Sequence, residues 1–80
     1  MDRQLARHVV ISAFHSMSYL TDLLPILKAH CDPQEFEIFR NAIASVAGNI
    51  SIDIIGKVFT AHPDLEQEIE ENVKKYGVPS

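Results

Sequence analysis

Several features that mark specialised small proteins are absent from this sequence or rare in it. It has a single cysteine, Cys31, so no internal disulfide can form and the disulfide-stabilised secreted class is excluded. No uninterrupted apolar run approaches the roughly 20 residues of a membrane-spanning helix, and no small-residue cleavage site follows the first apolar stretch. These absences predict a cytoplasmic protein with no membrane span.

Positive charge is also scarce. The chain carries 7 Lys and Arg against 11 Asp and Glu, a net charge of −4. Nucleic-acid affinity depends largely on Lys and Arg that neutralise phosphates, so nucleic acid is not the expected partner. Hydrophobic residues make up 46% of the 80 residues, which suits one globular domain over residues 1–80. Its stability margin is thin, because so short a chain buries only about 60% of its unfolded surface.

Apolar residues at steps of three and four predict a first helix from about Asp2 to His30. Pro25 lies inside it, lacks a backbone donor and disfavours the α conformation at Leu24. We therefore expect a kink or short break within residues 21–25. The stripe consists of Leu5, Val9, Ala13, Met17, Leu20, Leu24 and Leu27, widened by Ala6, Val10 and Phe14.

A second helix is predicted from Pro33 to about Ala61. Asp32 can cap it, Pro33 suits its first position, and Glu35 completes a capping box. Residues 49–54 alternate polar and apolar as a strand would, but no partner strand is visible elsewhere, so helix is favoured. The main apolar stripe consists of Phe36, Phe39, Ile43, Val46, Ala47, Ile50, Ile54 and Val58.

The third predicted helix is short and has opposite charges at its two ends. It starts at His62-Pro63-Asp64, has acids in its first turns and Lys74 and Lys75 in its last, and stops at Gly77. This order of charge complements the helix dipole. The expected fold is an all-α bundle of two long antiparallel helices, the first kinked near Pro25, plus a short C-terminal helix.

The second helix carries a second apolar face, roughly opposite the main stripe at about 100° per residue. Its residues are the candidate interface residues Ile38, Ile52, Ile55 and Phe59. A third helix of about 13 residues spans roughly 20 Å, so folding back from His62 it can cover Phe59, Ile55 and Ile52 but not Ile38. An apolar strip left exposed in this way is typical of an interface.

Small residues in 42–48 also favour close approach of another helix. They permit two backbones to come near, and pairing of two hairpins into four helices would bury the second face. We therefore expect a homo-oligomer, a dimer, or a helical protein partner. The alternative is a monomeric three-helix bundle in which the first helix uses the same flat surface.

No convergent set of chemical groups is visible. His8, His15 and Asp22 recur at seven-residue spacing, about 10.5 Å along a helix, too far apart for one metal ion. A hairpin brings His62 near the start of the first helix and leaves His30 and Cys31 at the other end, so no four-ligand set forms. The acidic run 64–71 is a solvated helix start rather than a catalytic pair. We expect no catalytic, metal or cofactor site.

Residues 43–58 resemble the helix-turn-helix of bacterial repressors. Ala44 and Gly48 fall where that motif has a small residue and a turn glycine, and Ile54 falls at a buried position of its second helix. The resemblance implies DNA binding by a small transcriptional regulator. Two features depart from the motif: an extra residue at Asn49, and a recognition helix in which only Lys57 is positive, whereas base reading uses Arg, Asn, Gln or Lys.

The sequence therefore predicts a small non-catalytic interaction or adaptor protein that self-associates through its second helix. The alternative is a DNA-binding regulator that uses residues 43–58. An enzyme comes third, because no catalytic group can be named.

Overall fold

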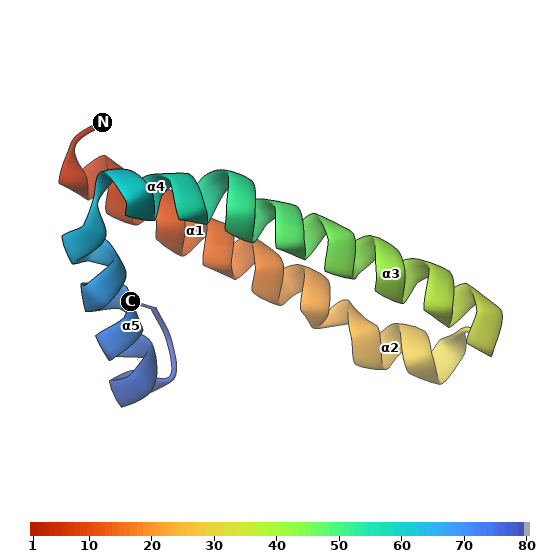
Figure 1. Cartoon of the computed structure of the whole chain (residues 1–80). Coiled ribbons are helices and arrows are strands. Elements are labelled where there is room, and N and C mark those ends of the chain that lie inside the picture. Colours follow the sequence, from red (N-terminus) through yellow and green to blue (C-terminus); the bar gives the residue numbers. More distant parts are fainter. Residues whose placement is uncertain (80) are drawn as a thin grey trace.

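The computed structural model describes residues 1–79, whose regular structure consists of helices: two long rods and a shorter helix (Figure 1). The first rod consists of α1 (Arg3–Thr21) and α2 (Leu23–His30). The second consists of α3 (Pro33–Asn49), the π-helical segment η1 (Ile50–Ile55) and α4 (Gly56–Ala61), and α5 (Pro63–Tyr76) follows. The predicted all-α fold is confirmed, and residues 49–54 are helical rather than extended.

The helix ends form where the sequence places capping residues. Asp32 accepts a hydrogen bond from the backbone N–H of Glu35 at 2.9 Å, and the Glu35 carboxylate accepts one from the backbone N–H of Asp32 at 3.5 Å, a complete capping box. The N–H of Glu35 holds the pKa of Asp32 below its usual range. At the other end, Gly77 stops α5 with φ of 78°, a left-handed conformation that glycine adopts without a Cβ clash.

The break in the first rod lies where proline predicts it. The α-helical pattern stops at Thr21, Asp22 forms a turn, and α2 begins at Leu23 with Pro25 in its first turn. Pro25 has no N–H to donate to the carbonyl of Thr21, so the hydrogen-bond ladder is interrupted there. The predicted kink within residues 21–25 is confirmed, and Figure 1 shows the rod changing direction at this point.

The second rod contains a π turn, which the spacing of its apolar residues does not predict. Across η1 the hydrogen bonds widen to the i→i+5 pattern, and the N–H of Gly56 donates to the carbonyl oxygen of Ser51. A single π turn inserts one extra residue into a helix and is often found at functional positions. The rod stays continuous, but each of its faces is rotated between α3 and α4 by about 100°, the angle that one residue occupies in an α-helix.

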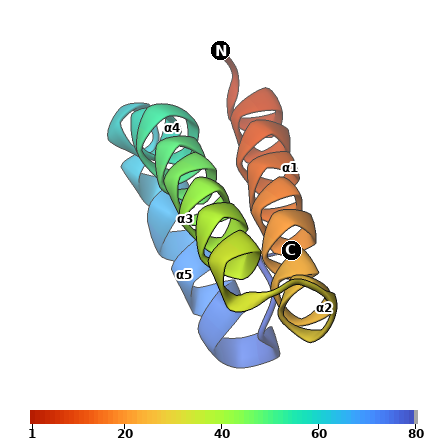
Figure 2. The same ribbon diagram turned by 90° about the vertical axis from the view of Figure 1, so that its right-hand side faces the viewer.

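The two rods lie side by side and antiparallel, and α5 packs on one side of the plane that they form (Figure 2). In Figure 1, α5 leaves the end of α4 at a steep angle, so the molecule is shaped like an L with extents of 45 × 25 × 15 Å. The core lies at the corner of the L and joins α1, η1, α4 and α5. It consists of Ala6, Val10, Ala13, Ile55, Val58, Leu65 and Ile69.

The predicted stripe of the first rod is displaced from the observed core. Ala6 and Val10 are fully buried, whereas Leu5 is about half exposed and Val9 is half-buried. The buried face of α1 is therefore centred on Ala6 and Val10, each one residue after the predicted stripe residues Leu5 and Val9. Small side chains at positions 6 and 13 allow the two rods to approach closely, which places the larger Leu5 at the margin of the contact.

Candidate interaction surface

The four predicted interface residues divide into two pairs. Ile38 and Ile52 are 66% and 72% exposed, among the most exposed large hydrophobic side chains of the molecule. Ile55 is only 5% exposed and Phe59 is half-buried against the core, so neither forms an open face of the second rod. The burial of Ile55 and Phe59 fits the expectation that the third helix can cover them, whereas Ile52 stays exposed, contrary to that expectation. The assignment of the four residues to an interface stays a prediction.

The π turn explains this division. In a regular α-helix, Ile54 follows Ile43 and Ile50 on one stripe and Ile55 points about 100° away. One inserted residue rotates the rod beyond η1 by about that amount, so Ile55 and Val58 take the inward positions and Ile54 moves to the margin, 42% exposed. The second apolar face predicted from ideal helical spacing is therefore, beyond η1, the core face of the chain itself.

Ion pairs hold α5 against the start of α1. The guanidinium of Arg3 donates to the carboxylates of Asp64 at 2.7 Å and Glu68 at 2.9 Å, and Arg7 donates to Glu68 at 3.1 Å. The hydrogen bond from Arg3 holds the pKa of Asp64 below its usual range. Beneath these pairs, Leu65 and Ile69 are almost completely buried. The acidic run is thus a docking element for α5 as well as a helix start.

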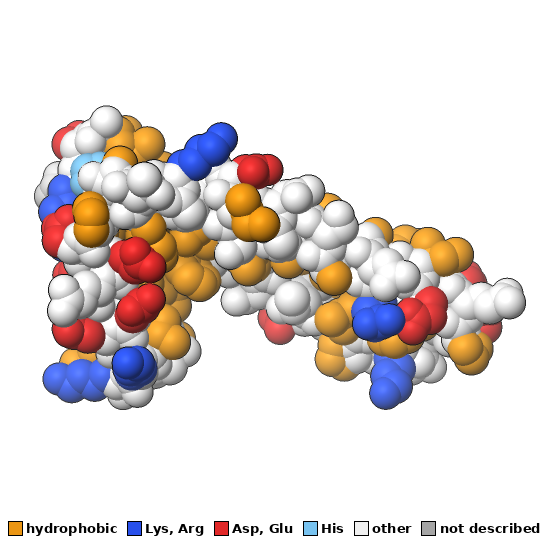
Figure 3. Space-filling model, viewed as in Figure 1, with side chains coloured by type: hydrophobic (Ala, Val, Ile, Leu, Met, Phe, Trp, Pro, Cys, Tyr) orange, Lys and Arg blue, Asp and Glu red, His pale blue; other side chains and the backbone are white. Residues whose placement is uncertain are grey.

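An apolar crevice remains in the angle between α5 and the rods. It has a volume of about 330 Å³ and is lined mainly by Phe14, Phe59, Ile69 and Val73. Figure 3 shows hydrophobic side chains gathered in this angle. The crevice lies directly over the core, so it continues the hydrophobic interior to the surface.

The lone chain is more extended than a compact protein of its size. Its radius of gyration is 14.8 Å, against about 12 Å for a compact domain of this length. Its accessible surface is 5668 Å², against about 4,850 Å² expected from the scaling of area with mass. The excess is about 800 Å² per chain. The elongated shape of the chain accounts for it, and many large apolar side chains stay exposed along both rods.

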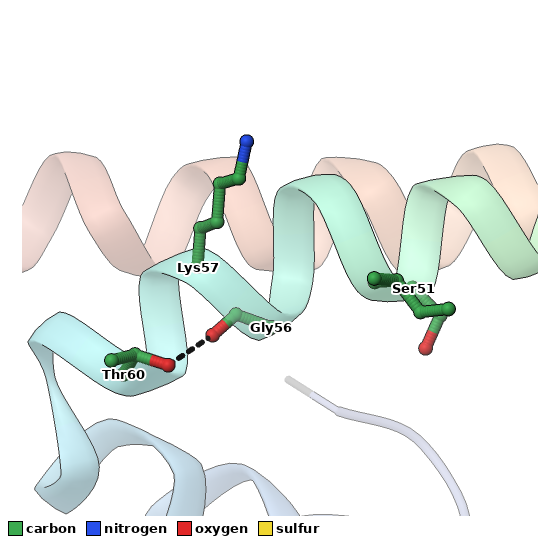
Figure 4. A pocket seen from close by; sticks show the side chains of 5 residues that line it. Ser51, Gly56, Lys57 and Thr60 are labelled. Atoms are coloured by element: carbon green, nitrogen blue, oxygen red, sulfur yellow. Dashed lines mark hydrogen bonds between the residues drawn. The ribbon is translucent and has the colours of Figure 1, made fainter.

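A shallow hollow of about 520 Å³ lies on the outer side of η1 and α4 (Figure 4). Ser51, Ile52, Gly56, Lys57 and Thr60 line it. The hydroxyl of Thr60 donates to the carbonyl oxygen of Gly56 at 2.9 Å, and the amine of Lys57 points away from Ser51 and Thr60 in Figure 4. The polar groups of this hollow do not converge on a common point, so it offers no catalytic arrangement.

The histidines and the cysteine do not gather at one place in the fold. His30 and Cys31 are at the turn between α2 and α3, whereas His62 is at the opposite end, where it lines a small hollow with Met1. Within residues 1–79, no group of three or more His, Cys, Asp or Glu side chains is arranged to hold a metal ion. The expected position of His62 near the start of the first helix is confirmed.

The region that resembles a helix-turn-helix does not form that motif. Residues 43–58 lie in α3, η1 and α4, which continue one another as a single rod (Figure 1). Gly48 has no positive φ, and Asn49 is right-handed helical. A helix-turn-helix needs two helices that cross at a wide angle, and that crossing is not formed here.

Both rods have the length and composition of a membrane-spanning helix. The best windows of residues 3–30 and 33–61 have mean hydropathies of 1.3 and 1.4, and only 11% and 17% of those windows are buried. The prediction that no segment can span a membrane rests on the length of uninterrupted apolar runs. By helix length and mean hydropathy that prediction is wrong. Core helices of soluble proteins and signal sequences meet the same criterion, so the rods alone do not assign a membrane location.

Comparison of the chain with protein-family models, with curated protein sequences and with solved structures gave no match.

Proposed function

We propose that this chain is a non-catalytic interaction protein that self-associates in the cytoplasm through the rod formed by α3, η1 and α4. The observation that carries the proposal is the large apolar surface that the folded chain leaves open on this rod. Ile38, Ile52, Phe39, Val46 and Ile54 are all between 42% and 72% exposed. Large exposed apolar patches on folded proteins are typical of protein interfaces.

The shape of the chain supports the same proposal. The excess of about 800 Å² over a compact protein matches the area that each partner contributes to an interface of standard size, about 800 Å². A second subunit would therefore bring the exposed area per chain down to the value typical of compact domains. Two-fold homodimers are the commonest soluble oligomers, which favours a second copy over an unrelated partner.

Two faces of the rod are candidates for this contact. The outer edge, which the sequence analysis predicted, carries Ile38 and Ile52. The second candidate comes from the structure and carries Phe39, Val46 and Ile54, whose side chains lie nearer the first rod. Both belong to the same rod, so both fit self-association, and they differ in which substitutions would disrupt it.

Light scattering after size exclusion tests the proposal. The expected mass is twice the 9.0 kDa of one chain, falling toward one chain on dilution. A single-chain mass from micromolar to millimolar concentration would reject self-association. A mass of one chain that doubles only in the presence of a helical protein from the same host would replace the homodimer by a heterodimer.

A further inference from the structure

The first rod presents three distinct faces. At about 100° per residue, Arg3, Arg7 and Phe14 share the side on which α5 packs, as their ion pairs and the apolar crevice show. The core residues Ala6, Val10 and Ala13 follow next around the helix. Beyond them, about 150° from the α5 side, lies a third group. It consists of Leu5, Val9, Ser16 and Leu20.

The second rod continues this third face. Around α1, Val9 and Ser16 are rotated in one direction from the core residues. Phe39 and Val46 are rotated in the same direction from the buried Ile43, and Ile54 is rotated in that direction from the buried Ile55. In two antiparallel helices whose core residues face each other, residues that are rotated in the same direction from the core lie on the same face of the pair. We call this the back face: Leu5, Val9, Ser16, Leu20, Phe39, Ala42, Val46 and Ile54. Within the described residues 1–79, no helix covers the side of the rods opposite α5 (Figure 2).

The composition of the back face is unusual for a surface exposed to water. None of these eight residues is charged and six are large and apolar, while Glu35, four residues before Phe39, is a charged residue on the same side of α3. The side of α1 that points away from the core carries the polar residues His8 and His15. The small residues Ser16 and Ala42 leave room for another helix to approach closely. This pattern is that of a buried layer inside a helical bundle rather than of a solvated side.

We propose that a second copy of the chain occupies the back face, so that the two hairpins pack as a two-fold four-helix bundle with an α5 on each outer side. This proposal rests on the proposed function and names the face that serves it. The area of about 800 Å² that each chain has in excess equals the contribution of one partner to a stable dimer. A two-fold contact matches the face with itself, so an apolar surface meets an apolar surface.

A lipid bilayer is less suited to these rods than a second copy. A spanning helix would place His8, His15, Asn49 and Asp53 in hydrocarbon, at a cost of several kcal/mol for each unsatisfied polar group. A dimer through the back face leaves His8 and His15 in water, because they lie on another side of α1. It also leaves the ion pairs of Arg3 with α5 in place.

Four charge substitutions in two matched pairs test the choice of face. Ser16→Glu and Val46→Glu place a carboxylate on the back face, one on each rod. Ser18→Glu and Ile52→Glu place the same group at exposed positions off that face. Each dimer would hold two such carboxylates in an apolar contact, so we expect the first pair to weaken dimerisation about 100-fold or more. The second pair should leave it within about threefold.

Ser16→Glu keeps the test decisive, because Ser16 is exposed on a helix and its replacement should leave the fold of one chain intact. Circular dichroism of each variant checks this. Loss of dimer in Ser18→Glu or Ile52→Glu, with none in Ser16→Glu, would overturn the back face while leaving self-association standing. A wild-type monomer would overturn both. A monomer that floats with phosphatidylcholine vesicles would assign the back face to lipid instead.

Discussion

Removal of Asp53 tests the origin of the shift in register along the second rod. Asp53 is exposed inside η1, and the rod carries one residue more there than a regular α-helix needs. Without it, a continuous α-helix brings Ile50 and Ile55 onto one stripe at the spacing of four that the α-helix prefers. The core beyond η1 would keep its contacts. We therefore expect the free energy of unfolding to stay within about 1 kcal/mol of wild type.

Deletion of Ala44 provides the matched control. Ala44 is also exposed, but it lies in regular α-helix. Its loss rotates either Ile43 or the segment with Ile50 by about 100° away from the first rod. Ile43 is 8% exposed, and exposing one such side chain costs about 1.5–3 kcal/mol.

Chemical denaturation followed by circular dichroism, at equal protein concentration, measures both deletions. Equal concentration matters because dimerisation raises apparent stability. We expect the free energy of unfolding of the Asp53 deletion to be close to that of wild type, and that of the Ala44 deletion to be lower by at least about 1.5 kcal/mol. If the two deletions cost the same, or if the Asp53 deletion is the worse, the register explanation is wrong.

Three further predictions concern the corner core, pH and the cap of α3. Leu65→Ala leaves a cavity in a fully buried position and should cost about 2–5 kcal/mol in urea denaturation, whereas the exposed Glu66→Ala should cost under about 0.5 kcal/mol. The pKa of Asp64 is lowered in the folded chain. Its ion pair with Arg3 therefore stabilises the fold above about pH 4, and this stabilisation is lost as the pH falls below that value. The denaturation midpoint of Arg3→Gln should therefore change less with acid than the midpoint of wild type. Asp32→Ala removes the cap of α3 and should lower the free energy of unfolding by about 1 kcal/mol, and an unchanged value would mean that water replaces the cap.

The sequence predicts the helices well because each boundary has a local cause. Asp32 with Pro33, the interruption before Pro25, and Gly77 after α5 each act through one or two neighbouring residues. The antiparallel pairing of the rods follows from the short turn between them. All of these features appear in the structure as expected.

The faces of the rods are harder to predict, because they depend on rotations that add up along the chain. One π turn displaces every face beyond it, and ideal spacing of 3.6 residues assigns Ile55 and Phe59 to the wrong side. The alternation in residues 49–54 does not reveal the π turn, because Ile50 and Ile54 also fit one stripe of a regular α-helix. The position of α5 depends on long-range contacts that no local pattern contains, namely the burial of Leu65 and Ile69 in the core and the ion pairs of Arg3.

Isotope-filtered nuclear Overhauser spectra of a mixture of labelled and unlabelled chains test the central claim most directly, because only contacts between two copies give signals. If a second copy occupies the back face, the methyl groups of Val46, Ile54 and Leu5 show contacts between chains and those of Ile38 and Ile52 do not. Contacts between chains at Ile38 and Ile52 alone, or no such contacts at millimolar concentration, would contradict the account.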